Sequence, residues 1–362
     1  RGRGAAAGRG ARGPTQPLHP LERIVSGVLI EGHGVTRHFP VRRGLFRRGA
    51  VRAVSGVDLG VRRGETVGLV GESGSGKSTL GRLMLGLLPL SAGQVTFDGI
   101  DVATRDRSQL RMLRRRMQLV FQDPYASLDP RRPAGDQIAD GLAIHAIGTP
   151  QERRARVRTL LDQVGLAPEH AARLPGSFSG GQRQRIAIAR ALATEPDFIV
   201  ADEPVSALDV SVQAQILNLM RRLQEEMGLT YLFISHDMSV VRHMSDRIAV
   251  MYLGRIVEQA PTEVLFADPK HPYTRLLLDT IPNVRAPRRG RVAQGGEVPS
   301  PLKPPSGCTF HPRCPDADLR CRSERPEVRS YADGSEVACH RVAEMMERMG
   351  APGSTARSLR VI

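Results

Sequence analysis

Short apolar runs alternate along the chain with segments whose apolar residues recur at helical spacing. Apolar runs cover Thr66 to Val70 and Phe198 to Ala201, and another run, in the stretch TYLFISHD, comes directly before His236. Strands buried on both faces of a parallel sheet are apolar along their whole length, so these runs indicate buried strands. Between residues 27 and 260 the alternation predicts an α/β domain with a largely parallel sheet.

The regions outside that domain differ in composition. The first region is rich in Gly, Arg and Ala and is predicted to be disordered; it lacks the apolar segment of a signal peptide. C-terminal to the domain, the sequence predicts short helices interrupted by proline. A Pro/Gly/Arg linker, a cysteine-bearing module and a tail with one short helix follow them. The expected division is a basic tail at 1–26, the main domain at 27–260, an extension at 261–340 with its linker at 284–306 and cysteine module at 307–340, and a tail at 341–362.

The apolar run that ends at Val70 leads directly into GESGSGKST, and helical spacing begins at Leu80. A glycine-rich loop between a strand and a helix can wrap a polyphosphate, because successive N–H groups and the helix N-terminus then point at the anion. Lys77 would reach the β- and γ-phosphates, and the Ser78 hydroxyl would bind Mg²⁺. The predicted nucleotide-binding residues of this P-loop are Gly71, Ser73, Gly74, Ser75, Gly76, Lys77, Ser78 and Thr79.

A second motif, PDFIVADEP, supplies the carboxylates that phosphoryl transfer requires. Asp202 ends the apolar strand and would help to hold Mg²⁺, and Glu203 follows it directly. A carboxylate beside the γ-phosphate can act as general base towards the attacking water. The alternative is a surface turn that happens to start with two acidic residues, and the buried strand before them disfavours it.

A second glycine-rich motif, FSGGQRQR, covers Phe178 to Arg185. After its P-loop the chain thus carries VFQDP, FSGGQRQR, DFIVADEP, SALD and ISHD, in this order. The motif order resembles that of the ATPase subunit of ABC transporters, over about residues 28–283. The resemblance implies an α/β, P-loop ABC-type nucleotide-binding fold with an antiparallel β subdomain and a helical subdomain at about 123–176, here followed by a small cysteine-containing extension.

In the family that the chain resembles, two ATPase domains pack head to tail, and each signature loop closes on the nucleotide of the other domain. Ser179, Gly180, Gly181 and Gln182 would accordingly contact the γ-phosphate in a partner's site. The helix that follows would point its positive end at the same anion. Asp209, in SALD, would cross the dimer interface.

The resemblance implies three further roles. Gln122 would sense Mg²⁺ and the attacking water, and His236 would contact the γ-phosphate. Phe39 would stack on adenine, for which a core phenylalanine is the alternative. The implied catalytic residues are therefore Glu203, His236 and Gln122, and the implied Mg²⁺ site comprises Ser78, Gln122 and Asp202.

Two segments behind the main domain, KHPYTRLLLDTIP and GCTFHPRCPDADLRC, resemble the C-terminal extension of oligopeptide and dipeptide importer ATPases. HFPVRRGLF and QLVFQDPYASLDPR favour the second of the two ATPase subunits that such importers usually encode. The implied function is ATP hydrolysis, with ATP and Mg²⁺, that powers uptake of di- and oligopeptides through a separate permease. One alternative is an ATPase subunit of the same kind that powers uptake of another small solute, such as nickel. The other is a soluble ABC ATPase that acts on nucleic acid or ribosomes, and the single ATPase core disfavours this second alternative.

The implied partners are a second, different ATPase subunit, two transmembrane permease subunits and an extracytoplasmic substrate-binding protein. No apolar run approaches the roughly 20 residues that a membrane-spanning helix needs. The large cysteine-free part of the chain argues against a disulfide-built secreted protein. The chain is therefore expected at the cytoplasmic face of the cell membrane as a peripheral subunit.

All four cysteines lie in the extension, at Cys308, Cys314, Cys321 and Cys339. Four thiolates suit a [4Fe–4S] cluster or Zn²⁺, although no pair has the C-x₂-C spacing usual for structural zinc. The resemblance favours the cluster, because the family's extension carries this cysteine pattern. Zinc and reduced structural thiols are the alternatives.

The formal net charge is +15, and arginine supplies nearly all of the positive charge. A basic protein can bind nucleic acid or anionic lipid. Aromatic residues make up only 4% and Trp is absent, so platforms for stacking bases are scarce. We interpret the charge chiefly as the product of a GC-rich coding sequence, with membrane headgroups as a lesser contribution, and we expect no nucleic-acid partner.

Overall fold

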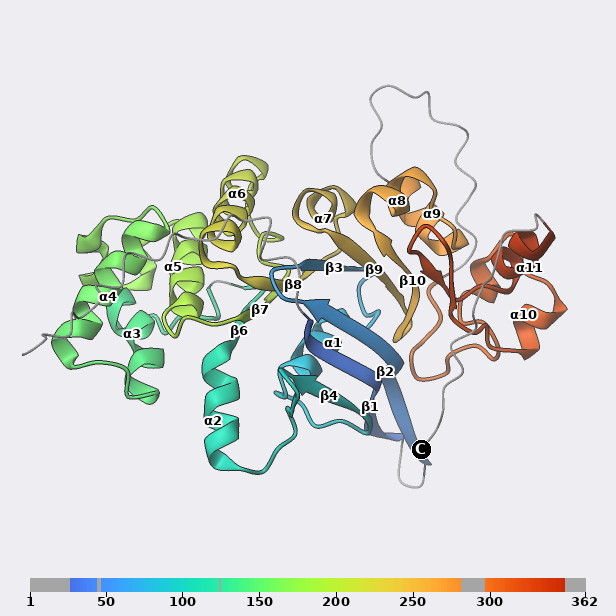
Figure 1. Cartoon of the computed structure of the whole chain (residues 1–362), viewed down its shortest axis with the longest axis horizontal. Coiled ribbons are helices and arrows are strands. Elements are labelled where there is room, and N and C mark those ends of the chain that lie inside the picture. The colour runs from blue at the N-terminus through green and yellow to red at the C-terminus, as the bar shows by residue number, and fades with distance from the viewer. Residues whose placement is uncertain (1–26, 44–46, 124, 281–296, 349–362) are drawn as a thin grey trace, which may run out of the picture.

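A computed structural model of the chain describes residues 27–43, 47–123, 125–280 and 297–348. The tail predicted at 1–26, most of the linker and the end of the C-terminal tail lie outside the described residues. Within these residues the molecule has a central sheet, a helical group at one end and the cysteine-bearing extension at the other (Figure 1). The described part contains no helix that is both long and apolar enough to cross a membrane.

The central sheet has eight strands and a parallel core, as the apolar runs predict. In the parallel part β9 pairs with β3, β3 with β8, β8 with β7, and β7 with β6. The remaining strands extend the β9 edge in antiparallel orientation. The strand order is β11 (Arg329–Ser330), β12 (Glu336–Val337), β10 (Arg255–Pro261), β9 (Arg247–Tyr252), β3 (Thr66–Val70), β8 (Thr230–Ser235), β7 (Phe198–Asp202) and β6 (Met117–Val120).

A second, antiparallel sheet of four strands covers one side of the core. Its order is β2 (Arg47–Arg62), β1 (Val28–Arg43), β4 (Ala92–Phe97) and β5 (Ile100–Asp101). Helix α1 (Lys77–Met84) lies between the two sheets (Figure 1). Leu80, Leu83 and Met84 of this helix share one apolar cluster with residues from both sheets. The expected ABC-type fold with an antiparallel subdomain is therefore confirmed.

Alternating residues of the central strands serve two separate cores. In β7, Phe198 and Val200 pack in the cluster around α1, whereas Ile199 and Ala201 pack in the cluster on the opposite face. Because successive side chains of a strand point to opposite faces, a strand between two helical layers must be apolar at every position. The opposite layer contains α6 (Val210–Met227), α7 (Met238–Met244) and α8 (Thr262–Ala267).

The helical group consists of α3 (Ala134–Ile144), α4 (Pro150–Gln163) and α5 (Gly180–Leu192), with short 3₁₀ turns at Pro168–Ala172 and Pro175–Ser177. A separate helix, α2 (Arg107–Arg116), leads into β6. Both α4 and α5 start with a capping box, in which a Ser or Thr side chain and a Glu or Gln side chain satisfy each other's backbone N–H groups. These local signals set where the helices begin.

The extension packs against the β10 edge of the sheet. It comprises α9 (Pro272–Asp279), a 3₁₀ turn at His311–Arg313, α10 (Leu319–Ser323), α11 (His340–Arg348) and the strands β11 and β12. His271 caps α9, since its Nδ1 accepts a hydrogen bond from the backbone N–H of Tyr273 at 3.0 Å. Burial lowers the pKa of His271 to about 3, so this ring is neutral and can accept.

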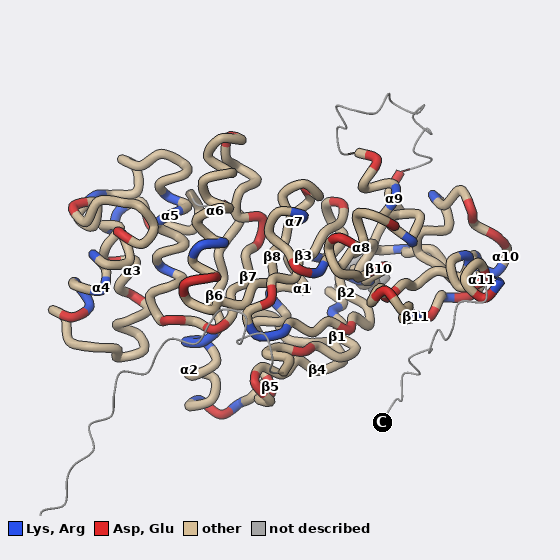
Figure 2. Tube along the Cα trace, turned by 45° about the horizontal axis from the view of Figure 1, so that its top comes forward, with Lys and Arg blue, Asp and Glu red and all other residues tan. Residues whose placement is uncertain are grey.

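Basic and acidic residues are interspersed over the described elements (Figure 2). Several arginines have structural partners: Arg116 pairs with Asp98 and Asp197, and Arg132 forms two hydrogen bonds with Asp140 at 2.7 Å. These ion pairs show that part of the arginine content serves the fold.

The close approach of α7 to β3 depends on a glycine. A Cβ atom at Gly68 would lie 2.3 Å from Val241 Cγ1 and 2.5 Å from Ser245 Oγ. We therefore expect Gly68→Ala to lower the free energy of unfolding by about 1–3 kcal/mol through overpacking, measured by urea denaturation. Gly176→Ala is the control, because a Cβ there would meet no atom within 4 Å. Equal stability of the two variants would contradict the packing shown here.

Candidate functional site

The P-loop holds its shape because two of its glycines lie against backbone carbonyl groups. A Cβ at Gly71 would lie 2.1 Å from the oxygen of Met251, and a Cβ at Gly76 would lie 2.1 Å from the oxygen of Ala53. Gly76 also has a φ of +106°. Neither position therefore accepts a larger residue without a shift of the loop.

Helix α1 begins directly behind this loop, and no side chain caps its first turn. The N–H groups of a first helical turn have no partner within the helix, so phosphate oxygens would satisfy them. Lys77 lies deep in the loop, with 5% of its surface exposed. Its Nζ donates to the backbone carbonyl oxygens of Gly71, at 2.7 Å, and Glu72, at 3.0 Å. Burial lowers the pKa of Lys77, and the carboxylates of Glu203, Asp202 and Glu72 partly oppose this effect.

Ser78 and Asp202 come together from α1 and the end of β7. The Ser78 hydroxyl donates to Asp202 Oδ1 at 2.7 Å, and Asp202 is 4% exposed. Burial raises the pKa of Asp202, while the hydrogen bond from Ser78 lowers it. A hydroxyl and a carboxylate at this separation are hard oxygen ligands of the kind that Mg²⁺ prefers, so these residues fit the metal that accompanies ATP.

The side chain of Glu203 contacts the other two predicted catalytic residues, Gln122 and His236. Its Oε2 accepts a hydrogen bond from Gln122 Nε2 at 3.1 Å and lies 3.2 Å from His236 Nδ1. Its backbone has a φ of +47°, and its N–H donates to the oxygen of Ile234 in β8. A non-glycine residue in this conformation is strained, and such strain is frequently found at functional sites. Three segments far apart in the sequence thus meet at one carboxylate.

The predicted signature residues lie apart from this cluster, at the start of α5 in the helical group (Figure 1). Ser179 and Gln182 form the capping box with each other. Gly181 lies against α6, where a Cβ would come within 2.5 Å of Val212 Cγ1. Asp209 occupies the N-cap position of α6 without a side-chain hydrogen bond to it. The structure therefore joins the P-loop to Asp202, Glu203, Gln122 and His236, but it does not join the signature to them.

Phe39 lies on β1, where it pairs with Val51 of β2. The same β2 strand supplies Ala53, whose carbonyl touches the P-loop. The guanidinium of Arg37 lies 4.7 Å from the centroid of the Phe39 ring. Phe39 is half-buried, and its adenine-stacking role stays a prediction.

The four cysteines are free thiols within the extension. The N–H of Cys308 donates to the oxygen of Cys321 at 2.9 Å. Burial raises the pKa of all four thiols, to about 12 for Cys314 and about 11 for Cys321. Among the residues that the structure describes, no three His, Cys, Asp or Glu side chains are grouped to hold a metal ion. As arranged, the cysteines do not fit an iron–sulfur cluster or zinc, and both expectations are without support.

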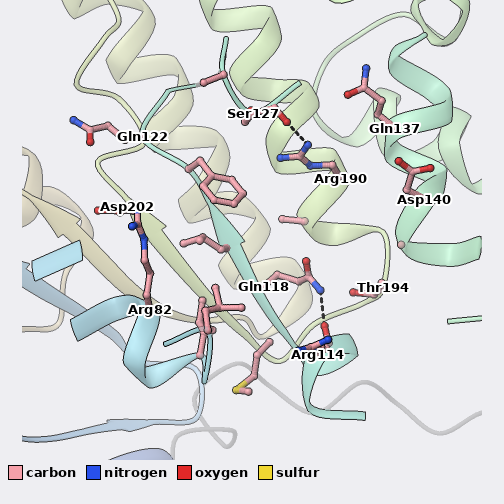
Figure 3. A pocket seen from close by; sticks show the side chains of 18 of the residues that line it. Arg82, Arg114, Gln118, Gln122, Ser127, Gln137, Asp140, Arg190, Thr194 and Asp202 are labelled. Carbon is pink, nitrogen blue, oxygen red and sulfur yellow. Dashed lines mark hydrogen bonds and ion pairs between the residues drawn. The ribbon is translucent and has the colours of Figure 1, made fainter. Parts of the chain in front are cut away.

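Sequence reasoning missed an open hollow beside this cluster (Figure 3). Its volume is about 670 Å³, and its lining includes Gln122, Asp202, Arg82 and Arg190 from four separate segments. Arg190 donates to the backbone oxygen of Ser127, which lines the hollow beside it. Sequence motifs marked Gln122 and Asp202, but no local pattern marks Arg82 or Arg190, because the hollow forms only where the helical group meets the sheet.

The loop geometry leads to a matched pair of variants. Gly76→Ala places a Cβ against the Ala53 oxygen, so the loop must shift, and we expect the affinity for ATP to fall by at least tenfold. Gly74→Ala is the control: its φ is +77°, but a Cβ there would meet no atom within 4 Å. Gly74→Ala therefore introduces the strain of a positive φ but no clash between the new Cβ and a backbone carbonyl group. Titration with a fluorescent ATP analogue measures both, and equal affinities would contradict the role of the carbonyl contact.

Two family models match the chain. The model described as "ABC transporter" covers residues 54–206, and that described as "Oligopeptide/dipeptide transporter, C-terminal region" covers residues 257–321. Among solved structures, a dimeric ATP-binding cassette with bound ADP and phosphate is 33% identical, with a TM-score of 0.57 over 64% of this chain and 98% of that one. A cassette from Clostridium perfringens is 28% identical, with a TM-score of 0.58 over 67% of this chain and 92% of that one.

Curated relatives match over most of the chain. The oligopeptide transport ATP-binding protein AppF of Bacillus subtilis (strain 168) is 51% identical over 86% of this chain and 97% of its own length. The di/tripeptide transport ATP-binding protein DppF of Pseudomonas aeruginosa (strain UCBPP-PA14) is 48% identical over 88% and 99%. The chain therefore belongs to the ATP-binding proteins of ABC transporters, in the branch that carries the oligopeptide/dipeptide transporter C-terminal region.

Proposed function

We propose that this ABC ATPase powers the uptake of di- and oligopeptides through a separate membrane permease. The observation that carries the proposal is the combination of an assembled ATPase cluster around Glu203 with the C-terminal region at residues 257–321. Curated relatives that cover most of the chain are named for oligopeptide and di/tripeptide transport. The resemblance to importer ATPases, rather than any contact in the structure, supports peptide as the solute.

The residues of the site suggest how hydrolysis proceeds. The P-loop amides and Lys77 would hold the β- and γ-phosphates, and Ser78 and Asp202 would hold Mg²⁺, which supplies positive charge opposite the phosphate oxygens. Glu203 would accept a proton from the attacking water as the water oxygen bonds to the γ-phosphorus and the bond to ADP breaks. Gln122 and His236, both at hydrogen-bond distance from Glu203, would orient the water and the γ-phosphate.

The signature residues would serve a second ATPase subunit. Ser179 is exposed at the N-terminus of α5, where the helix dipole favours an anion. Its position away from the chain's own P-loop supports contact with a nucleotide held by a partner, and the solved cassette with ADP and phosphate is dimeric. We propose a different ATPase subunit as that partner, with Asp209 at the interface between the two.

The hollow beside Gln122 would receive the permease. Its rim includes the exposed apolar side chains of Leu87 and Phe121, which are 50% and 43% exposed. Exposed apolar side chains around a concave surface are typical of protein interaction sites. A permease seated there would contact the loop that carries Gln122, so nucleotide binding and permease movement would be coupled. The subunit would lie at the cytoplasmic face of the membrane, opposite an extracytoplasmic peptide-binding protein.

The division of the chain and the cysteine cofactor stay separate proposals. Residues 27–260 would form the ATPase domain, with its helical subdomain at about 123–176, and residues 261–340 the importer-type extension. A [4Fe–4S] cluster or Zn²⁺ on the four cysteines would require them to rearrange from the positions described here. Iron, zinc and sulfide analysis of anaerobically purified protein tests this hypothesis without any activity assay.

Replacement of the general base tests the enzymatic part of the proposal. Glu203→Gln keeps the size of the side chain but cannot accept a proton, so we expect ATP hydrolysis to fall by about 100-fold or more while ATP binding is retained. Phosphate release by the intact transporter measures the first quantity, and titration with a fluorescent ATP analogue measures the second. Glu225→Gln, at an exposed site on α6, is the control. Undiminished hydrolysis in the Glu203 variant would refute the assignment.

The same variant tests the transport function in cells. In a strain that lacks this chain, the unaltered chain should restore uptake of labelled di- and oligopeptides, and the Glu203→Gln chain should not. Nickel uptake, measured in the same strains, distinguishes a nickel importer from a peptide importer. Restored nickel uptake with no peptide uptake would contradict peptide as the substrate while leaving the ATPase assignment intact.

A charge at the rim of the hollow should prevent permease docking. We expect Leu87→Glu to reduce recovery of the permease subunits at least tenfold in a tagged co-purification from native membranes, because a buried unpaired carboxylate is costly in an interface. Leu319→Glu is the control, since Leu319 is also exposed and lies on α10, at the end of the molecule away from the helical group. Full recovery of permease with the Leu87 variant would show that it docks elsewhere.

A further inference from the structure

The P-loop contains an acidic residue, Glu72, although its expected ligand is a polyphosphate. An unpaired carboxylate in this position would repel the phosphates. The structure shows that it is paired. Arg313 Nη1 lies 2.8 Å from Glu72 Oε2, and Arg313 Nη2 lies 2.9 Å from Glu72 Oε1. Two parallel hydrogen bonds between a guanidinium and a carboxylate form the strongest geometry for such a pair.

Arg313 belongs to the extension, 241 residues further along the chain. Its side chain is only 5% exposed. Its guanidinium carbon lies 5.8 Å from the ring centroids of Tyr252 and Phe310, and Nη1 is 3.5 Å from the Tyr252 hydroxyl. Because these rings belong to a packed aromatic group, the guanidinium has a fixed position. A bidentate pair with a buried guanidinium and a partly exposed carboxylate differs from a fully exposed ion pair, which contributes little.

The backbone of Glu72 is held from the same side. Its N–H donates to the Tyr273 hydroxyl at 2.9 Å. Tyr273 is itself fixed by the cap from His271, whose backbone N–H donates in turn to Glu258 at 2.9 Å. The HPY stretch thus orients a hydroxyl group towards the P-loop, and Lys77 holds the carbonyl group of Glu72.

We infer that Arg313 and Tyr273 are positioning residues of the ATP site: Arg313 neutralises Glu72, and together they hold the start of the P-loop in its phosphate-binding shape. This inference rests on the proposed binding of ATP phosphates by the P-loop. It makes the extension a part of the nucleotide site. A purely structural contact would stabilise the docked extension without any effect on the charge that ATP meets.

Charge-matched variants separate these two possibilities. Arg313→Gln leaves Glu72 unpaired, whereas the double variant Glu72→Gln/Arg313→Gln removes both charges. We expect the single variant to bind a fluorescent ATP analogue with Mg²⁺ about tenfold more weakly, and the double variant to recover to within about threefold of the unaltered chain. In the assembled transporter the KM for ATP should rise in the single variant, with kcat changed less than twofold. The full-length chain is used throughout.

Two further variants complete the experiment. Arg320→Gln, in the same module, breaks an exposed pair with Glu324 and should bind the analogue like the unaltered chain. Tyr273→Phe keeps the ring but leaves the Glu72 N–H without its acceptor, and should weaken binding about threefold. Thermal unfolding without nucleotide measures the stability of every variant.

The outcomes are distinct. Unchanged binding in Arg313→Gln, or a double variant that binds as weakly as the single variant, would overturn the neutralising role of Arg313. Unchanged binding in Tyr273→Phe would overturn the role of its hydroxyl. Failure of the unaltered chain to bind the analogue would contradict the proposed function itself, and not this inference.

Discussion

The site depends on a loop whose backbone must approach other backbone closely. Gly71 and Gly76 lie against the carbonyl groups of Met251 and Ala53, which belong to β9 and β2. These two strands come from different sheets, so the shape of the loop requires that both sheets be in place. Since α1 starts at the same loop and its apolar side packs between the sheets, the folded core and the anion-binding geometry form together.

The carboxylates divide into two roles according to their surroundings. Asp202 is buried and accepts a hydrogen bond from Ser78, and these two oxygen ligands suit its proposed role of holding Mg²⁺. Glu203 follows it in a strained conformation and faces Gln122 and His236 instead. In the proposed mechanism, one of these adjacent carboxylates would hold the metal and the other would accept a proton. The positive φ of Glu203 directs the two side chains to different partners.

The extension illustrates how an added module can become part of an existing site. It continues the central sheet through β12 and supplies aromatic rings to the core beside the P-loop. Its neutral, buried histidine fixes α9, and its arginine reaches the loop. Removal of such a module would expose an apolar surface and leave the Glu72 carboxylate unpaired in the loop. The same contacts of the extension would therefore serve both the stability of the fold and the binding of nucleotide.

Features that depend on neighbouring residues in the chain could be predicted without the structure. The strand–loop–helix of the P-loop, the strand that ends at Asp202 and the capped start of α5 all follow from short-range rules of spacing, capping and burial. Motif order was enough to anticipate the ABC-type fold. The resemblance implied that Gln122 and His236 act together with Glu203, but their contacts with its carboxylate, the hollow beside them and the pairing of Arg313 with Glu72 are apparent only in the folded structure. These contacts join segments up to 241 residues apart, and no periodicity within a segment specifies its distant partner. The same limit applies to the four cysteines: four clustered thiols and the resemblance suggested a ligand set, whereas the fold leaves them as free thiols, two buried and two partly exposed.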